Sequence, residues 1–261
     1  MENTILTVLP FIGLMGGFFS GLLGLGGGVI MLPLLSVVGR VPLKLATGTT
    51  LVQVTIAAAI GMLSHYQGGM VDLKAGLILG MAGIAGGFVG SLLSVPLSIR
   101  FLESIFLFVV ALAIILLFIP LELEDKNYRK GNFNKAFGIA IGFGVGVLAG
   151  LLGVGVLAGL LGVGGGFIII PLMTYFLKIP LRVTIGTSLL IILISSFGTL
   201  GAKFKIGHVN LLITFLVISG SVIGAFLGAY VSRRTQVKSL RLVLLSILVL
   251  IFITVGYKTF F

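Results

Sequence analysis

Two groups of residues have the types and spacing needed to bind a small anion. Each group joins a run of three glycines to hydroxyl side chains further along the chain. The first group is Gly26, Gly27, Gly28, Thr49, Thr50 and Gln53. The second group is Gly164, Gly165, Gly166, Thr187 and Ser188. Because backbone N–H groups freed at a glycine run and side-chain hydroxyls donate hydrogen bonds to oxyanions, we predict that these residues bind the substrate.

Both features also have a purely structural interpretation. Thr and Ser near the start of a helix commonly cap that helix instead of binding a ligand. Glycines four residues apart let two helix backbones approach closely. This second pattern explains Gly13, Gly17, Gly21, Gly220, Gly224 and Gly228. Three adjacent glycines exceed what packing needs, so we interpret the two runs as breaks in a helix.

The composition is that of a helical integral membrane protein. Hydrophobic residues make up 58% of the 261 residues, charged residues only 9%, and the mean hydropathy is +1.31. A soluble domain of this length has no need for so much apolar surface. The apolar runs are continuous rather than alternating, so we expect membrane-spanning helices. A helix break inside such a span is tolerated only where protein or a water-filled cavity satisfies the backbone.

The formal charge of +11 comes from 17 Lys and Arg residues against 6 Asp and Glu residues. Most of the cations lie in short segments between apolar runs, which is typical of loops that orient a membrane protein. They are not clustered with aromatic residues, so we expect no nucleic-acid partner. The first apolar run has no Lys or Arg ahead of it, so we expect it to be a retained span and not a signal peptide.

The chain consists of two homologous halves. An offset of 138 residues, which is 164 − 26, aligns Gly26 with Gly164 and Thr49 with Thr187. The register holds without a gap between these positions. We therefore predict three parts: a first transmembrane repeat at 1–120, a polar linker at 121–135 and a second transmembrane repeat at 136–261.

A second, shorter repeat precedes the second glycine run. The sequence GVLAGLLGV occurs at 146–154 and again, unchanged, at 155–163. Nine helical residues add about 13.5 Å and half a turn to a helix. A rigid insertion would turn the preceding helix face away from its neighbours. We therefore expect the extra copy to loop out or to lengthen the helix beyond the bilayer.

We expect about eight transmembrane helices and two short re-entrant segments, one after each glycine run. The segments at 29–38 and 167–177 are too short to cross a bilayer alone. If each of them reverses the chain, the halves are inverted, and eleven of the 17 Lys and Arg residues fall on the side of the linker. Parallel halves would divide the same cations nine to eight. The positive-inside rule favours inverted repeats, with the linker in the cytoplasm and both termini outside.

Ionisable side chains are scarce within the predicted spans. Those at span ends are His65, Asp72, Lys203, Lys205 and His208, and we expect them to be solvated anchors. The alternative is that His65 or His208 serves a proton-coupled carrier, but neither has a carboxylate nearby within a span. The scarcity of carboxylates argues against a transporter of metal cations, and we predict no metal site and no cofactor. Neither an HExxH sequence nor a phosphate-binding loop occurs, so we do not expect an enzyme.

Two copies of a G-x-G-G-G-x-x-x-x-P-L motif, at 24–34 and 162–172, resemble the TauE/SafE sulfite-exporter family. The segments at 42–50 and 180–188 and the G-H-V-N element at 207–210 are also similar to that family. The resemblance covers nearly the whole chain, and the nine-residue duplication departs from it. It implies a multi-pass permease in the cytoplasmic membrane of a prokaryote that moves sulfite, sulfonates or sulfoacetate, usually outward.

We therefore expect an all-α membrane transporter whose partners are a small anion and the lipid bilayer. In this interpretation the two glycine breaks meet near the midplane, and one half rocks against the other to give alternating access. Two alternatives stay open: a passive anion channel, and a membrane scaffold whose glycines serve packing only. The sequence also leaves open a coupling proton or ion and the oligomeric state.

Overall fold

A computed structural model describes residues 2–94, 98–119, 131, 134–153, 166–205 and 210–260, and every regular element in those ranges is helical. The elements of the first half are α1 (Glu2–Leu23), α2 (Gly28–Pro33), the π-helix η1 (Leu34–Val38), α3 (Leu43–Gln67), α4 (Leu73–Ser94) and α5 (Ile99–Phe118). Those of the second half are α6 (Lys135–Gly153), α8 (Gly166–Phe176), α9 (Leu181–Lys205), α10 (Leu211–Arg234) and α11 (Val237–Phe260).

The outer surface of this helical assembly suits a bilayer. By length and composition, three helices in the described part of the chain could cross a membrane: Gly48–Gln67 of α3, Leu211–Arg234 of α10 and Val237–Thr254 of α11. Large apolar side chains are exposed on the outside; Phe215 is 72% exposed, Phe108 71% and Ile253 61%. Apolar side chains can face the hydrocarbon of a bilayer without a free-energy cost. The exposed surface therefore agrees with the predicted all-α membrane class. The total of about eight spans stays a prediction.

The chain turns back on itself at the first glycine run. α1 ends at Leu23, and the following segment returns along α1 as α2 and η1. Met31 of α2 packs against Gly16, and Gly39, just after η1, lies beside Ile12. Residue numbers fall along α1 as they rise along the segment after the break, so this segment runs antiparallel to α1. This reversal lets α3 begin near the start of α1.

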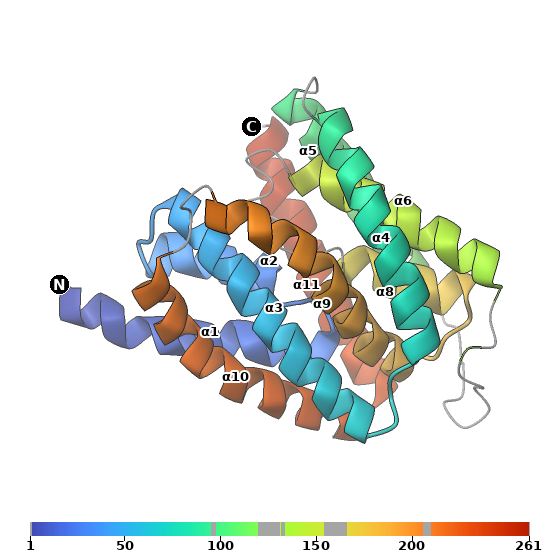
Figure 1. The fold of residues 1–261 in the computed structure, drawn as a ribbon, viewed down its shortest axis with the longest axis horizontal. Helices are drawn as coiled ribbons and strands as arrows, with labels where there is room; N and C mark the ends of the chain where they lie inside the picture. Colours follow the sequence, from blue (N-terminus) through green and yellow to red (C-terminus); the bar gives the residue numbers. More distant parts are fainter. Residues whose placement is uncertain are drawn as a thin grey trace.

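Glycines hold α1 and α10 in backbone contact, and the two helices lie side by side in Figure 1. A Cβ added to Gly13 or Gly17 would overlap the carbonyl oxygen of Val217 or Ser221. From the other helix, a Cβ on Gly224 would overlap the carbonyl of Leu14. Positions on the two helices rise together, so α1 and α10 run parallel. The interpretation of these glycines as packing residues is confirmed.

The pair α4 and α6 repeats this arrangement on the other side of the molecule (Figure 1). A Cβ on Gly86 would overlap the carbonyl of Phe143, and one on Gly142 would lie 2.6 Å from the carbonyl oxygen of Leu79. These helices also run parallel. Under the 138-residue offset Leu73 aligns with Leu211, so α4 is the counterpart of α10. Each close pair therefore joins helices from different halves.

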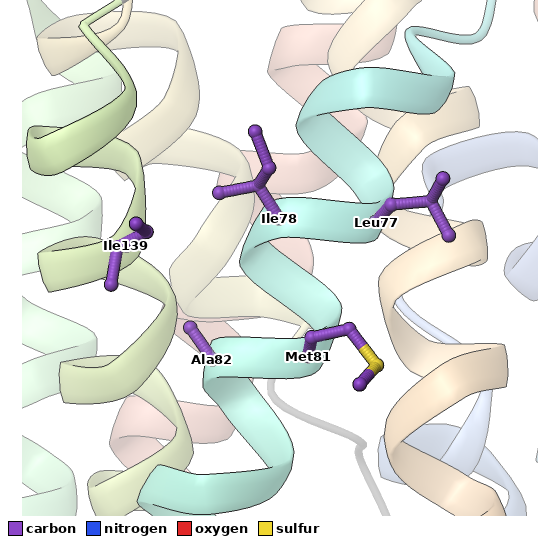
Figure 2. A pocket seen from close by; sticks show the side chains of 5 residues that line it. All are labelled: Leu77, Ile78, Met81, Ala82 and Ile139. Atoms are coloured by element: carbon purple, nitrogen blue, oxygen red, sulfur yellow. The ribbon is translucent and has the colours of Figure 1, made fainter.

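A shallow groove opens beside α4 and α6, and Figure 2 shows the side chains that line it. It has a volume of about 430 Å³ and is lined by Leu77, Ile78, Met81, Ala82 and Ile139. None of these side chains can hydrogen-bond to an anion. The groove therefore fits lipid chains and not the predicted substrate.

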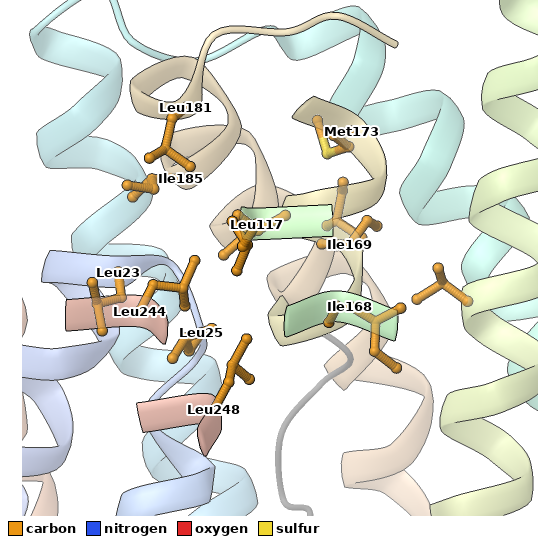
Figure 3. Packing of buried hydrophobic residues seen from close by; sticks show 14 of the residues in the cluster. Leu23, Leu25, Leu117, Ile168, Ile169, Met173, Leu181, Ile185, Leu244 and Leu248 are labelled. Carbon is orange, nitrogen blue, oxygen red and sulfur yellow. The ribbon is translucent and has the colours of Figure 1, made fainter. Parts of the chain in front are cut away.

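In the centre of the molecule, α3 of the first half runs antiparallel to α9 of the second. Gly61 of α3 faces Leu189 of α9, and Gly186 of α9 faces His65 of α3. Positions rise along one helix as they fall along the other. Beside this pair, the largest buried apolar cluster of the described residues joins the end of α1 to α4, α5, α6, α8, α9 and α11 (Figure 3). Its labelled members include Leu25, Ile169 and Leu248.

Substituting Gly224 with alanine tests the close approach of α1 and α10. The added Cβ has no space beside the carbonyl of Leu14, so Gly224→Ala should destabilise the fold by about 1–3 kcal/mol. Gly144 of α6 is the matched control, because nothing lies within 4 Å of its Cβ position. There the same substitution should stabilise the helix by up to about 1 kcal/mol. Thermal unfolding in detergent measures both, and equal melting temperatures for Gly224→Ala and the wild type would contradict the packing described.

Candidate functional site

The first glycine run forms the break that the sequence predicts. Gly24, Gly26 and Gly27 adopt φ angles of +71°, +80° and +73°. Side-chain-bearing residues pay an energetic penalty in this left-handed region, and glycine does not. Space is also lacking, because a Cβ on Gly27 would overlap the carbonyl of Gly16. Gly28 begins α2, so all three glycines of the first predicted group lie at the turn between α1 and α2.

A predicted side chain of the second half contacts this break. The hydroxyl of Ser188 in α9 lies 2.8 Å from the carbonyl oxygen of Gly24 and 2.8 Å from that of Ile185 in its own helix. Serine hydroxyls donate one proton, so the two carbonyls share it. The hydroxyl motif of one half therefore satisfies backbone exposed by the break in the other half. The sequence alone did not indicate this exchange.

Two of the predicted residues on α3 bind side chains of α10. The hydroxyls of Thr49 and Thr214 are 3.2 Å apart, and Nε2 of Gln53 donates to the hydroxyl of Ser221 over 2.8 Å. Thr49 and Gln53 are four residues apart and share one face of α3. That face is turned toward α10, and all four side chains are buried.

Three buried oxygen atoms on α1 and α3 have no hydrogen-bond partner: Ser20 Oγ, Thr50 Oγ1 and Gln53 Oε1. Their residues are completely inaccessible to solvent. We call them the Ser20–Thr50–Gln53 niche. Leaving one buried polar atom unsatisfied costs about 1–3 kcal/mol, so such groups are rare in native structures unless a ligand or water completes them.

Two members of the niche, Ser20 and Thr50, lie near the break on two different helices, whereas Gln53 faces α10. Ser20 of α1 is adjacent to the turn, since its Cβ lies 3.2 Å from the Cβ position of Gly27. Thr50 shares a face of α3 with Val54, four residues on, and Val54 Cγ1 lies 3.0 Å from the Cβ position of Gly26. The hydroxyl of Thr50 and that of Ser20 therefore flank the glycine turn.

The capping interpretation is wrong for the first hydroxyl group. α3 begins at Leu43, its N-cap is Pro42, and no side chain caps it. Thr49 and Thr50 lie further along, inside the helix. Thr187 in α9 has a different role, because its hydroxyl accepts the backbone N–H of Asp72 over 2.9 Å. It joins the two halves without touching the niche through any hydrogen bond described.

The second break is described only from its last residue onward. Gly166 begins α8, whereas Gly164 and Gly165 lie outside the described residues. The second copy of GVLAGLLGV also lies outside them, and α6 ends at Gly153. The predicted role of these glycines in substrate binding stays a prediction.

The expectation that His65 and Asp72 are solvated anchors is wrong. Each is only 1% exposed. Asp72 accepts the backbone N–H of Ala75 at the start of α4 and that of Gly131 in the linker. His65 contacts the carbonyl of Gly21 near the end of α1. Both lie at element ends, as expected, but neighbouring helices and the linker cover them.

Metal ligation is not supported by the part of the chain described. Those residues contain no group of three or more His, Cys, Asp and Glu side chains that could hold a metal ion. The polar groups that meet at the break are hydroxyls, one amide and backbone atoms.

Sequence reasoning missed Ser20, Ser221 and Thr214. Each is an isolated hydroxyl within an apolar helix and belongs to none of the motifs. Ser221 follows Gly220 in the glycine stripe of α10, which is the one signal that places it near α1. Nothing in the sequence pairs it with Gln53, since the two are 168 positions apart.

Comparison with known proteins agrees with the motifs. Residues 9–255 match the family described as Sulfite exporter TauE/SafE. The probable membrane transporter protein YunE of Bacillus subtilis is 28% identical over 97% of this chain and 98% of its own length. The probable membrane transporter protein MJ0441 of Methanocaldococcus jannaschii is 26% identical over 94% of this chain and 92% of its own length.

A further relative from Bacillus subtilis, the probable membrane transporter protein YdhB, is 30% identical over 82% of this chain and 84% of its own length. No solved structure matches the chain. The resemblance drawn from the glycine motifs is confirmed, and the family and these relatives are described as transporters, not enzymes. This chain belongs to the TauE/SafE sulfite-exporter family of transmembrane transporters.

Proposed function

We propose that this protein is a permease that exports small sulfur-containing anions, of the sulfite, sulfonate or sulfoacetate type, by alternating access. The observation that carries the proposal is the Ser20–Thr50–Gln53 niche, with its three buried oxygens that lack partners, those of Ser20 and Thr50 near the first break. The predicted residues Gly26, Gly27, Thr50 and Gln53 lie in or beside it. Ser20 is added to the predicted set.

The chemistry of the niche suits a weakly held oxyanion. The hydroxyls of Ser20 and Thr50 are free to donate to sulfonyl or sulfite oxygens. Nε2 of Gln53 is held by Ser221, so its Oε1 is left to accept a hydrogen bond, either from hydrogensulfite or from a water that accompanies the anion. The niche contains no charged side chain. A neutral site binds loosely enough to release its substrate, as transport requires.

We further propose that the two halves are inverted repeats in the cytoplasmic membrane of a prokaryote, with the linker inside. Three relations support the inversion. α1 runs parallel to α10, α4 runs parallel to α6, and α3 runs antiparallel to its counterpart α9. Inverted halves with a site where their broken helices meet are a common basis of alternating access.

The absence of cysteine from the chain allows a direct test of the inversion. Gln67 and Lys205, at the ends of α3 and α9, are related by the 138-residue offset. Single-cysteine variants Gln67→Cys and Lys205→Cys should react with a membrane-impermeant maleimide from opposite sides, Lys205→Cys in intact cells and Gln67→Cys only after permeabilisation. Labelling of both from the same side would favour parallel halves.

Transport by variants of the niche tests the site. Thr50→Val and Gln53→Leu keep the approximate volume and remove the polar atoms, so each should lower kcat/KM for labelled sulfite or sulfoacetate by about tenfold, the equivalent of one lost hydrogen bond. Proteoliposome uptake measures the effect. Thr55→Val is the matched control, because the Thr55 hydroxyl bonds only the carbonyl of Leu51 within α3.

The niche is not the binding site if Thr50→Val and Gln53→Leu both transport as fast as Thr55→Val. The same vesicles separate the alternatives. Accumulation against a concentration gradient excludes a passive channel, and the absence of any flux from well-folded wild-type protein would favour a scaffold.

A further inference from the structure

His65 is a buried histidine with one ring nitrogen in use and one without a partner. It lies in the last turn of α3 and is 1% exposed. Its Nε2 lies 2.9 Å from the carbonyl oxygen of Gly21, shortly before α1 breaks. A carbonyl only accepts, so Nε2 carries the proton and donates it. Nδ1 therefore holds a lone pair, and it is buried without a hydrogen-bond partner.

A histidine that serves packing alone would have both nitrogens satisfied or one of them in water. Here the acceptor nitrogen is enclosed, and the neighbouring hydroxyl Ser64 Oγ is also buried without a partner. Around His65, the described residues do not form a group of three or more His, Cys, Asp and Glu side chains that could hold a metal ion. The ligand that fits a single buried imidazole lone pair is a proton.

His65 contacts two elements that the proposed transport involves, the end of α1 before the break and α9 of the opposite half. Through Gly21 it contacts the end of α1, three residues before the turn at Gly24. Through its Cβ, 2.9 Å from the Cβ position of Gly186, it contacts α9 of the second half. Ser188, two residues further along α9, is the side chain that binds the carbonyl of Gly24. The histidine therefore contacts α1 just before its break and α9 close to the residue that binds the break.

The charged groups around His65 in the described part of the chain come from two elements. Arg233 of α10 packs against Gly68, with Nη1 3.3 Å from its Cβ position, so its positive charge lies near the last turn of α3. Asp72 precedes α4, and its backbone N–H donates to the hydroxyl of Thr187, next to Gly186. Its carboxylate accepts the backbone N–H groups of Ala75 and Gly131. The last turn of α1 carries no basic residue.

We propose that His65 is the proton-binding residue that couples anion transport to a pH gradient. Protonation at Nδ1 keeps the Nε2–H bond to Gly21 and adds a positive charge at the C-terminal end of α1, where the helix dipole favours a cation. That charge lies next to the break and attracts an anion to an otherwise neutral niche. Because such coupling is reciprocal, a bound anion favours the proton equally, and the two cross together, outward when the outward gradient of the anion exceeds the inward gradient of protons.

Proton binding can be measured without transport. His65 and His208 are the two histidines of the chain, so His208→Gln leaves His65 as the only one. In protein labelled with ¹⁵N-histidine, the signal of Nδ1 should titrate between about pH 5 and 8, and sulfoacetate should shift its midpoint upward. A ring that stays in the Nε2–H form throughout this range, with and without sulfoacetate, overturns the proposal.

Coupling is measured in proteoliposomes with labelled sulfoacetate, which stays ionised over this pH range, and with the membrane potential clamped by valinomycin and potassium. In wild type and in His208→Gln, a gradient of one pH unit should drive up to about tenfold accumulation, the proton ratio across the membrane. In His65→Gln, which keeps a donor for Gly21 but binds no proton, the ratio of uptake with and without the gradient should fall to one. Undiminished gradient-driven uptake by His65→Gln overturns the proposal.

The role of His65 in coupling rests on the proposed transport function, and the two can fail separately. A titrating Nδ1 in wild-type protein that moves no sulfoacetate or sulfite would overturn the proposed function and leave the proton site. Active transport by a protein whose Nδ1 does not titrate would overturn the proton site alone.

Discussion

Close backbone contact between α1 and α10, and between α4 and α6, is the constraint on which the rest of this structure depends. Lipid chains are as apolar as the helix surfaces, so helices associate in a bilayer through packing and not through the hydrophobic effect. Glycines at positions such as Gly17 and Gly224 remove the side chains that would hold the backbones apart. Each close pair takes one helix from each half. The halves are thereby joined at two places around the central helices α3 and α9.

The second requirement is that a helix broken inside this assembly must have its backbone satisfied. Two carbonyls near the break, those of Gly21 and Gly24, are met by His65 and Ser188, which come from α3 and α9. A membrane interior has no water to do this, so the side chains are obligatory wherever the chain leaves the helix. Other polar atoms near the turn, Ser20 Oγ and Thr50 Oγ1, have no partner and are left able to bind a ligand. The region of the break therefore contains both the groups that stabilise it and the groups proposed to bind the anion.

Much of the fold could be predicted because the signals are local and repeated. The helices follow from apolar runs, the two halves from the 138-residue offset, and the break from three adjacent glycines. The candidate site could be predicted only in part. Thr50 and Gln53 could be predicted because they lie near the start of the apolar segment that follows the break, whereas Ser20 and Ser221 belong to no motif. From the sequence His65 and Asp72 resemble surface anchors, because the residues next to them in the chain do not indicate that other helices bury them.

By itself, the sequence determined the class of the protein and the position at which α1 breaks, and it predicts the duplication and a second break. These follow from composition, from alignment of the chain with itself, and from the conformational freedom of glycine, all of which act over short distances. Only the tertiary structure decided that Ser188 serves the break of the opposite half, that Gln53 binds Ser221, and that the acceptor nitrogen of His65 is enclosed. Those contacts join residues more than forty positions apart, and they depend on the directions in which packed helices run.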